Sequence, residues 1–169
     1  YGVESVGLKP ENQNLLPLGF SITYRKNRPF PHTLHLVPKT VVLGIGCKRG
    51  TEAESIRALI RETLEQNQIF KESICLIASI DLKKDEEGIR ICAEELGVPF
   101  VTWSAEELEQ VQSEDGFTES AFVRSVAGVG NVCERSALKG AGTSRLLIRK
   151  TAHNGVTVAA AVKDYTVCM

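Results

Sequence analysis

The most chemically useful residues of this chain lie in one glycine-rich segment, residues 44–51. The segment combines three glycines with a thiol, two cations and a hydroxyl, in the order Gly44, Gly46, Cys47, Lys48, Arg49, Gly50 and Thr51. Glycine allows tight turns and a close approach of the backbone to a ligand. Backbone amides at a following helix start, together with the two cations, would attract a carboxylate or a phosphate. We predict an anion-binding loop here; a tight turn that only packs a helix on a sheet is the alternative.

A nucleotide fits this segment poorly. The dinucleotide fingerprint Gly-x-Gly-x-x-Gly requires a glycine where Arg49 stands. It also requires an acidic residue about 20 residues further on, and the strand-end acid of this chain, Asp81, lies well beyond that distance. The Gly-Lys-Ser/Thr of a P-loop is absent from the segment. A carboxylate is therefore the better ligand group for the loop.

Cys47 is a candidate catalytic nucleophile. It precedes Lys48 and a predicted helix start, and such an environment can lower the pKa of a thiol. No histidine is near it in the sequence, so His153 would have to be a partner in space. The alternative is a small side chain packed in the turn.

A hydroxyl, a carboxylate and an ammonium occur within five residues at Ser79, Asp81 and Lys83. Alternation along a strand would place all three on one side. Asp81 could then act as a general base or orient water, while Lys83 neutralises a substrate carboxylate and Ser79 donates a hydrogen bond. The alternative is that Asp81 caps a turn and Lys83 is solvated.

Further candidate ligand-binding residues follow a third strand or precede another helix. They are Ser104, Gly128, Gly130 and Asn131. Loops that follow parallel strands converge outside the carboxyl ends of those strands, so we expect these residues to join the two earlier segments. The cysteines and histidines lack the spacing of metal ligands, and we predict no metal site.

The elements that must position these residues alternate along the chain. The predicted strands cover residues 40–43, 73–80, 100–103, 145–150 and 156–162. The predicted helices cover residues 51–66, 104–111 and 118–127. Another helix is predicted to end at Gly97, and a further one to begin at residues 131–134. Capping boxes at Thr51 with Glu54 and at Ser104 with Glu107 predict two of the helix starts.

The order of these elements predicts an α/β fold. Early strand-helix alternation indicates parallel strands, and Asn154-Gly155 between two β-rich runs is a strong hairpin signal. We expect a three-layer α/β/α domain with a mixed, mainly parallel sheet and a C-terminal β-hairpin. This domain spans residues 39–162. It follows a linker region with one or two edge strands, residues 1–38, and precedes a tail, residues 163–169.

Composition excludes several classes of function. With 43% hydrophobic residues and a net charge of −1, the chain is neither disordered nor broadly attracted to nucleic acid. An odd number of cysteines, five, and the lack of a signal peptide or an apolar run of about 18 residues predict a reduced cytoplasmic protein without a membrane span. Because it begins at Tyr1 within sequence that already reads as folded, we expect a piece of a longer polypeptide. Its oligomeric state stays open.

Three segments together resemble the C-terminal domain of the CbiG/CobE family of cobalamin biosynthesis proteins. They are residues 44–51, Ser79-Ile80-Asp81-Leu82-Lys83 with the acidic Asp85 and Glu86, and Gly128-Val129-Gly130-Asn131-Val132-Cys133-Glu134. The resemblance runs in order over residues 39–162. It implies the activity of a cobalt-precorrin-5A hydrolase, which opens the precorrin lactone and releases acetaldehyde to give cobalt-precorrin-5B.

The resemblance also implies the ligand. A cobalt-precorrin would carry the cobalt itself, so no cofactor of the protein's own is expected, and other enzymes of the cobalamin pathway could be partners. Asp81 is then the first candidate for positioning water, and the amides of residues 46–51 could stabilise an oxyanion. Proteins made of this domain alone, the CobE type, occur in the same family. A non-catalytic module that binds or carries a corrinoid intermediate is therefore the alternative function.

Overall fold

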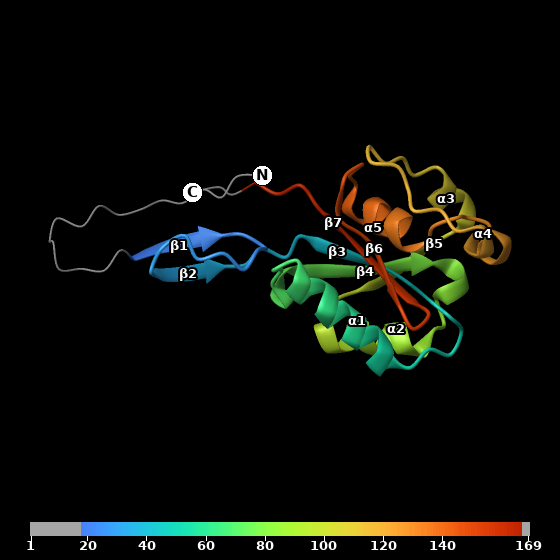
Figure 1. Ribbon diagram of the computed structural model, residues 1–169, viewed down its shortest axis with the longest axis horizontal. Coiled ribbons are helices and arrows are strands. Elements are labelled where there is room, and N and C mark those ends of the chain that lie inside the picture. Colours follow the sequence, from blue (N-terminus) through green and yellow to red (C-terminus); the bar gives the residue numbers. More distant parts are fainter. Residues whose placement is uncertain (1–17, 167–169) are drawn as a thin grey trace, which may run out of the picture.

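The computed structural model describes residues 18–166, and its main body is a five-stranded sheet between layers of helices (Figure 1). The strands are β3 (Val41–Cys47), β4 (Ile74–Ile80), β5 (Phe100–Trp103), β6 (Leu146–His153) and β7 (Val156–Val162). Their order in the sheet is β5-β4-β3-β7-β6. Strands β3, β4 and β5 are parallel, whereas β7 is antiparallel to both of its neighbours. The predicted α/β class and mixed sheet are confirmed.

The C-terminal hairpin forms where the sequence predicted it. Its turn residues, Asn154 and Gly155, have φ angles of 49° and 78°. Two successive positive φ angles define the turn that matches the twist of hairpin strands, and Asn-Gly is the pair that adopts it most readily. The hairpin closes at the pair His153 and Val156, and β7 then pairs with the whole of β3.

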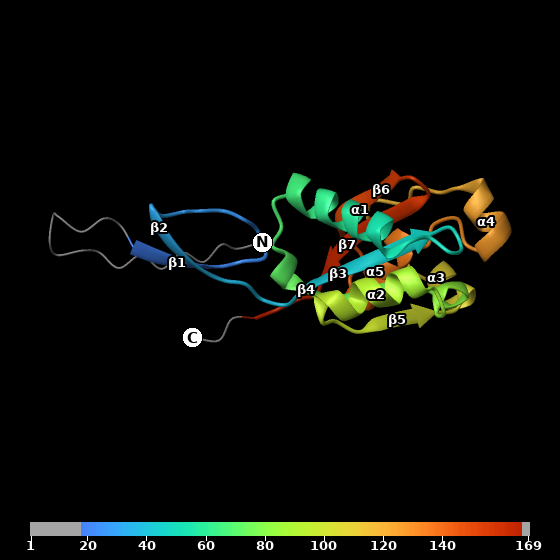
Figure 2. The same cartoon turned by 90° about the horizontal axis from the view of Figure 1, so that it is seen from below.

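Helices cover both faces of the sheet (Figures 1 and 2). One face carries α1 (Ala53–Gln66) and α2 (Glu87–Leu96), and the other carries α5 (Cys133–Ala141). Two short helices, α3 (Ala105–Glu109) and α4 (Ala121–Ala127), precede α5, and two 3₁₀ turns, η1 (Lys71–Ser73) and η2 (Asp81–Lys83), flank β4. This is the predicted three-layer arrangement.

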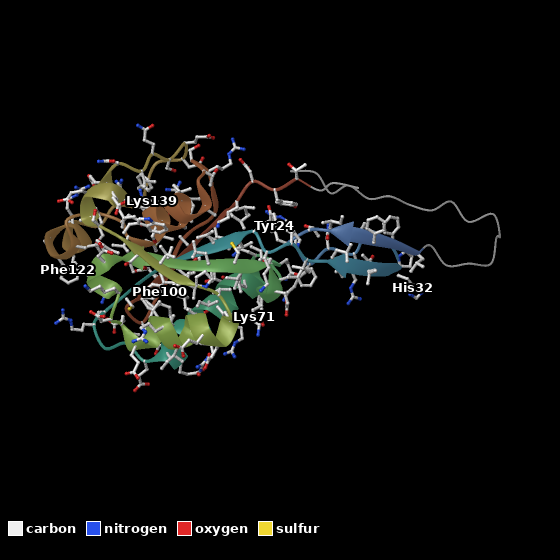
Figure 3. The ribbon with its side chains drawn as sticks, turned by 180° about the vertical axis from the view of Figure 1, so that it is seen from behind. Tyr24, His32, Lys71, Phe100, Phe122 and Lys139 are labelled. Carbon is white, nitrogen blue, oxygen red and sulfur yellow. The ribbon has the colours of Figure 1, made fainter. Side chains whose placement is uncertain are left out.

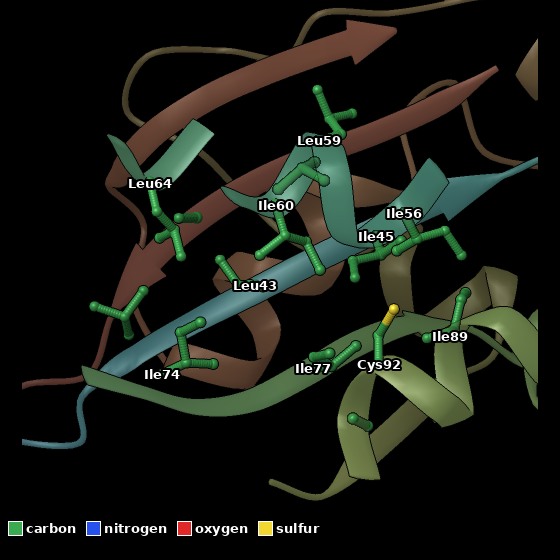
Figure 4. Packing of buried hydrophobic residues seen from close by; sticks show 14 of the residues in the cluster. Leu43, Ile45, Ile56, Leu59, Ile60, Leu64, Ile74, Ile77, Ile89 and Cys92 are labelled. Atoms are coloured by element: carbon green, nitrogen blue, oxygen red, sulfur yellow. The ribbon is translucent and has the colours of Figure 1, made fainter. Parts of the chain in front are cut away.

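The main core lies between the sheet and α1 with α2 (Figure 4). Alternate residues of β3, among them Leu43 and Ile45, point into it and meet Ile56 and Ile60 of α1. Full burial of side chains of this size contributes roughly 1.5–3 kcal/mol each. The opposite side of β3 carries a glycine instead, because a side chain at Gly44 would overlap the carbonyl oxygen of Cys133 in α5.

Two helix starts differ from their predictions. Helix α1 begins at Ala53 after Glu52, which makes no side-chain cap, so the predicted Thr51–Glu54 capping box is wrong. The Thr51 hydroxyl donates to the carbonyl oxygen of Lys48 at 2.7 Å, and its oxygen accepts no hydrogen bond from a backbone amide of α1. The helix predicted from residue 118 begins at Ala121.

The other predicted caps are confirmed. The Ser104 hydroxyl oxygen accepts from the Glu107 amide at 3.2 Å, and the Glu107 carboxylate accepts from the Ser104 amide at 3.0 Å. Gly97 ends α2 and Gly128 ends α4, both in the left-handed conformation that glycine adopts without strain.

The region before the domain forms its own small sheet. Strands β1 (Leu18–Ile22) and β2 (His32–Leu36) pair in parallel, and Figures 1 and 2 place them at one end of the molecule. A β-bridge from Arg25 to Ile69 and a hydrogen bond from the Phe70 amide to the Tyr24 carbonyl oxygen, 2.9 Å, join this region to the main body. The rest of the predicted linker, residues 1–17, and the end of the tail, residues 167–169, lie outside the described residues.

Over residues 18–166, no helix has both the length and the apolar character needed to cross a membrane. Four cysteines in this range are free thiols: Cys47, Cys75, Cys92 and Cys133. The fifth, Cys168, lies outside it. The same part of the chain holds no group of three histidine, cysteine or acidic side chains placed to bind a metal ion.

Candidate functional site

The parallel strands β3, β4 and β5 end at one edge of the sheet, which we call the carboxyl edge. It consists of residues 47–52 at the end of β3, residues 81–86 after β4 and residues 103–104 at the end of β5. In Figures 1 and 2 these segments lie at the end of the molecule opposite β1 and β2. Ligands of open α/β sheets bind outside such an edge, as the sequence predicted for this chain.

A bridge of charged and polar groups joins the first two loops of the edge. The Glu86 carboxylate accepts from the Gly50 amide at 2.6 Å and from the Lys83 ammonium at 3.2 Å. Glu86 is only 9% exposed, so water screens these contacts little. Gly50 has a φ of 73°, in the left-handed region that favours glycine, and its amide therefore faces Glu86 rather than a ligand.

Cys47 lies beside this bridge, and its surroundings differ from those predicted. Burial raises the pKa of the Cys47 thiol above its ordinary value; the Lys83 charge opposes that rise, the Glu86 charge adds to it, and the Thr51 hydroxyl opposes it. A protonated thiol is a weak nucleophile. The expectation that Lys48 and the helix start would lower this pKa is contradicted, because burial outweighs the nearby charges.

His153 does not serve as a partner for Cys47. The sheet register aligns Cys47 with Val156, and Val156 with His153, so the two residues are separated by two strand spacings. Neighbouring strands lie about 4.8 Å apart, which places the two backbones about 9–10 Å apart. The pair forms no thiol–imidazole hydrogen bond, and a Cys–His mechanism has no support here.

Asp81 is placed where it can act on a ligand. It begins η2 at the end of β4 and is exposed. Its Oδ1 accepts a hydrogen bond from the Thr102 hydroxyl of β5 at 2.6 Å. Within residues 18–166 its second oxygen, Oδ2, accepts none. A carboxylate fixed through one oxygen and open at the other has the geometry of a group that holds or deprotonates a water molecule.

The other two residues of that segment differ from the expected arrangement. Strand β4 ends at Ile80, so Ser79, Asp81 and Lys83 do not alternate along one strand, and that part of the prediction is wrong. Ser79 is fully buried, and its hydroxyl donates to the Ile45 carbonyl oxygen of β3 at 2.7 Å. In this structure Ser79 joins two strands, while Lys83 is paired with Glu86 and is not free in solvent.

The predicted cations are available at the edge. Lys48 and Arg49 are exposed, and neither has an ion-pair partner among residues 18–166. The Lys48 amide donates to the Gly155 carbonyl oxygen at 3.1 Å. The Lys48 side chain lies against Gly155, where an added β-carbon would come within 3.0 Å of Lys48 Cδ and Cε. Of the loop amides proposed to hold an oxyanion, those of Lys48 and Gly50 are thus already occupied.

Two glycines of the loop pack against other elements. A side chain at Gly44 would displace α5, and one at Gly46 would lie 2.7 Å from the Thr157 hydroxyl oxygen of β7. Both positions therefore need glycine for packing, whatever the loop binds. Ser104, at the end of β5, lies at the edge and caps α3.

The third predicted segment is divided between surface and interior. Gly128 is exposed, whereas Gly130 and Asn131 are buried. The Asn131 amide group donates to the Thr118 carbonyl oxygen at 2.8 Å and to the Glu134 carboxylate at 2.7 Å, and its Oδ1 accepts from the Glu134 backbone amide at 2.9 Å. Asn131 is thereby fully engaged in starting α5, and the structure does not bring it to the edge as a ligand-binding residue.

Two buried carboxylates were not predicted as important. Glu86 was recognised only as one of the acidic residues after Lys83, and no residue pattern indicated its contact with Gly50. Glu134, fully buried, accepts from the Thr118 amide at 2.8 Å, the Thr118 hydroxyl at 3.1 Å and the Lys150 amide at 2.8 Å. Its position in a helix-start pattern, Asn131-x-x-Glu134, was the available signal.

A cavity of about 320 Å³ lies away from these residues, beside α1 and α2. Its lining includes Ile60, Leu64 and Cys92, with Arg61 and Lys71 among the surrounding cations. None of the predicted site residues lines it. The two residues predicted as catalytic, Asp81 and Cys47, therefore lie at the carboxyl edge and not beside this cavity.

Similar proteins come from cobalamin biosynthesis. The chain is 34% identical over 128 residues to the "Cobalt-precorrin-5A hydrolase" of Priestia megaterium, an alignment of 76% of this chain and 33% of that protein. It is 40% identical over 104 residues to the protein of the same name from Salmonella typhimurium, covering 62% of this chain and 29% of that protein. The chain thus spans about a third of the length of these relatives.

A solved structure shares the fold. The crystal structure of CobE, a protein from the cobalamin (vitamin B12) biosynthetic pathway, matches with a TM-score of 0.65 and 31% identity over 74% of this chain and 91% of that chain. The family model described as "Cobalamin synthesis G C-terminus" matches residues 41–161. These residues include every strand and helix of the main body except the last residue of β7. The chain therefore belongs to the family of the cobalamin synthesis protein G C-terminal domain.

Proposed function

We propose that this domain holds a cobalt-precorrin at its carboxyl edge for a cobalt-precorrin-5A hydrolase reaction. The observation that carries this function is the carboxylate oxygen of Asp81 that accepts no hydrogen bond within residues 18–166, at the same edge as Lys48 and Arg49, which form no ion pair within that range. A precorrin bears several carboxylates, which the two cations can engage. The names of the relatives from Priestia megaterium and Salmonella typhimurium support the same reaction.

In the proposed reaction, water opens the lactone of the substrate. Asp81 takes a proton from the water at Oδ2, the water oxygen bonds to the lactone carbonyl carbon, and the ring C–O bond then breaks to leave a carboxylate. The oxygen released from the lactone then becomes the carbonyl oxygen of acetaldehyde as the C–C bond that joins the two-carbon fragment to the macrocycle breaks, and the electron pair of that bond stays on the macrocycle. The cobalt belongs to the substrate, so this chemistry requires no metal held by the protein. Burial raises the pKa of the Cys47 thiol, so we give this thiol no role in the proposed reaction.

A binding or carrier module is the second candidate function. Its support is that CobE, a pathway protein of which 91% is covered by the match, consists almost entirely of this fold. A domain that occurs without the rest of a hydrolase can serve by binding alone. In either function we place the protein in the cytoplasm with other pathway enzymes, in keeping with the four free thiols.

An assay of acetaldehyde release distinguishes the two functions. This chain and the complete polypeptide that carries it are incubated separately with cobalt-precorrin-5A, and acetaldehyde is assayed. Release by the complete polypeptide supports the hydrolase function, and release by the chain alone would place catalysis within this domain. Macrocycle binding without acetaldehyde from either protein would contradict the hydrolase and favour the carrier.

Asp81→Asn tests the assignment of the base. We expect acetaldehyde release by the complete polypeptide to fall by about 10²–10⁴-fold, the usual contribution of a general acid or base. Asn can still accept from the Thr102 hydroxyl, so the fold of the edge is kept. Asp85→Asn, at an exposed carboxylate of the same loop, is the matched control and should change the rate little. Unchanged turnover in Asp81→Asn would show that the base lies elsewhere.

A further inference from the structure

Large apolar side chains are exposed near the carboxyl edge. We call these the apolar patch: Leu82, Phe122 and Val126, which are 61%, 73% and 65% exposed. Single exposed apolar residues are common on protein surfaces, but Phe122 and Val126 form an exposed apolar pair one turn apart on α4, and Leu82 lies in the loop after β4. Figure 3 shows Phe122 on α4 at the end of the molecule opposite His32, which is the end where the edge loops lie in Figures 1 and 2.

Helix α4 has two apolar sides and buries only one of them. Val123 and Ala127, one turn apart, pack on a cluster that includes Ile80 at the end of β4. Phe122 and Val126, also one turn apart, remain exposed on the other side. Leu82 follows Ile80 by only two residues. Its backbone therefore lies close to the cluster on which α4 packs.

The exposure of Phe122 does not come from a loose helix. Arg124 of α4 pairs with Glu109 at 3.2 Å and with Glu119 at 3.1 Å. The Ser120 hydroxyl oxygen accepts from the Val123 amide at 3.3 Å at the start of the helix. Because α4 is fixed on its inner side, the outward position of Phe122 is part of the fold.

Unpaired cations lie at the same edge. We call Lys48, Arg49 and Lys84 the edge cations; all are exposed, and among residues 18–166 none has an ion-pair partner. Acidic residues such as Glu52 and Asp85 share the edge, so its charge is not uniformly positive. Salt screens exposed charges beyond about 8 Å. A carboxylate of a ligand must therefore sit directly at an edge cation.

We propose that the apolar patch is the seat for one face of the precorrin macrocycle, and that the edge cations bind its peripheral carboxylates. This rests on the proposed function and names the residues that would select its substrate. A tetrapyrrole macrocycle is apolar on its faces and anionic at its rim, which complements an apolar patch beside separate cations. A phosphate or a small carboxylate would use the cations and leave Phe122 in water.

The seat can be tested on this chain with cobyrinic acid, a stable cobalt corrin with free carboxylates, as the probe. Trp103 is the single tryptophan of the chain and packs on the same cluster as Val123 and Ala127, so quenching of its fluorescence by the corrin reports binding. We expect Phe122→Ser to weaken probe binding about tenfold to hundredfold, as the loss of a buried aromatic contact does. Leu34→Ser, at a 62% exposed residue of β2 far from the edge, should stay within about twofold of the unaltered chain.

Several other results would contradict the binding of the macrocycle at the apolar patch. Equal weakening by Leu34→Ser would show general adsorption, and wild-type affinity in Phe122→Ser would show that the patch is not used. If Phe122→Ser keeps wild-type affinity while the double variant Lys48→Ala and Arg49→Ala no longer binds the probe, the carboxyl edge still binds the substrate and only the role of the apolar patch is contradicted. If the chain takes up no probe, and sedimentation shows self-association that Phe122→Ser removes, the patch is an interface between copies. If it takes up no probe and stays monomeric, the seat and the substrate edge both fail, while acetaldehyde release by the complete polypeptide still tests the hydrolase.

Discussion

At the scale of single residues, burial decides what Cys47 can do. The thiol is half-buried, and the opposing charges of Lys83 and Glu86 leave burial as the main influence on its pKa. Where a folded-state pKa is raised, the unfolded chain releases its proton first as the pH increases. The contribution of Cys47 to stability is therefore complete below the ordinary thiol pKa and is lost as the pH rises through the raised value.

Alkylation of the thiols measures this effect. We expect iodoacetamide to modify Cys47 more slowly than free cysteine near pH 7, because less of the thiol is ionised. Cys75 is the matched control: it is also half-buried, and burial likewise raises the pKa of its thiol. Peptide mass spectrometry resolves the two sites. Modification of Cys47 as fast as free cysteine, while Cys75 stays slow, would restore the nucleophile hypothesis.

Glu86 joins two loops of the carboxyl edge through its carboxylate. Glu86→Ala leaves the Gly50 amide and the Lys83 ammonium without their partner, and we expect a loss of about 1–3 kcal/mol in the free energy of unfolding. Glu87→Ala removes the next acidic residue, which is exposed, and should cost less than about 0.5 kcal/mol. Urea titration compares the two variants. Similar losses in both would mean that the bridge contributes little beyond charge at the start of α2.

At the scale of elements, the approach of α5 to β3 depends on Gly44. A β-carbon there would overlap the Cys133 carbonyl oxygen and lie 2.8 Å from the Ala137 amide nitrogen. Both are backbone atoms of a helix, so α5 would have to move away from the sheet. Because Asn131 and Glu134 at the start of α5 hold Thr118, the displacement would reach the segment that leads into α4.

Gly44→Ala is accordingly expected to cost at least about 3 kcal/mol, the upper part of the range for overpacked cores. Gly97→Ala is the control, since a β-carbon at that position meets no atom within 4 Å and only the left-handed backbone opposes it. That backbone term is about 1–2 kcal/mol. Thermal or urea unfolding separates the two values. A Gly44→Ala loss no greater than that of Gly97→Ala would show that α5 can shift freely.

The elements were predictable where their signals are local. Asn154-Gly155 specified the hairpin, Ser104 with Glu107 specified a helix start, and Gly97 specified a helix end, each through residues a few positions apart. The convergence of the loops after β3, β4 and β5 could be predicted because parallel strands end at the same edge of a sheet. Thr51 was mispredicted because α1 begins at Ala53, which puts Glu52 rather than Thr51 at the N-cap position.

The roles of the site residues were harder to predict because they depend on distant partners. Glu86 meets an amide 36 positions away, and Ser79 meets a carbonyl oxygen 34 positions away. The pattern showed that these polar residues lie near strand ends. Which of them would be buried and satisfied, and which would stay open like Asp81, was decided by packing between elements that are far apart in the sequence.

At the scale of the whole molecule, the β1–β2 sheet and the carboxyl edge lie at opposite ends (Figures 1 and 2). The sheet connects to the main body near the start of β4, through the bridge at Ile69, the Tyr24–Phe70 hydrogen bond and a ring contact between His35 and Phe70 with centroids 5.1 Å apart. These contacts support one end of the core. None of them involves a residue of the edge.

A chain that begins at Lys39 should therefore lose stability but keep its binding site. We expect the free energy of unfolding to fall by about 2–4 kcal/mol, from the lost backbone hydrogen bonds and the packing of Tyr24 on the core. Affinity for cobyrinic acid should stay within about twofold, because no bridge or hydrogen bond from residues 18–38 reaches the edge loops. Trp103 fluorescence measures this affinity at a temperature where both chains are folded. The chain of residues 1–169 with Phe122→Ser should show the opposite result: wild-type stability and weakened binding. A shortened chain that folds but no longer binds the probe would show that residues 1–38 contribute directly to the corrinoid site.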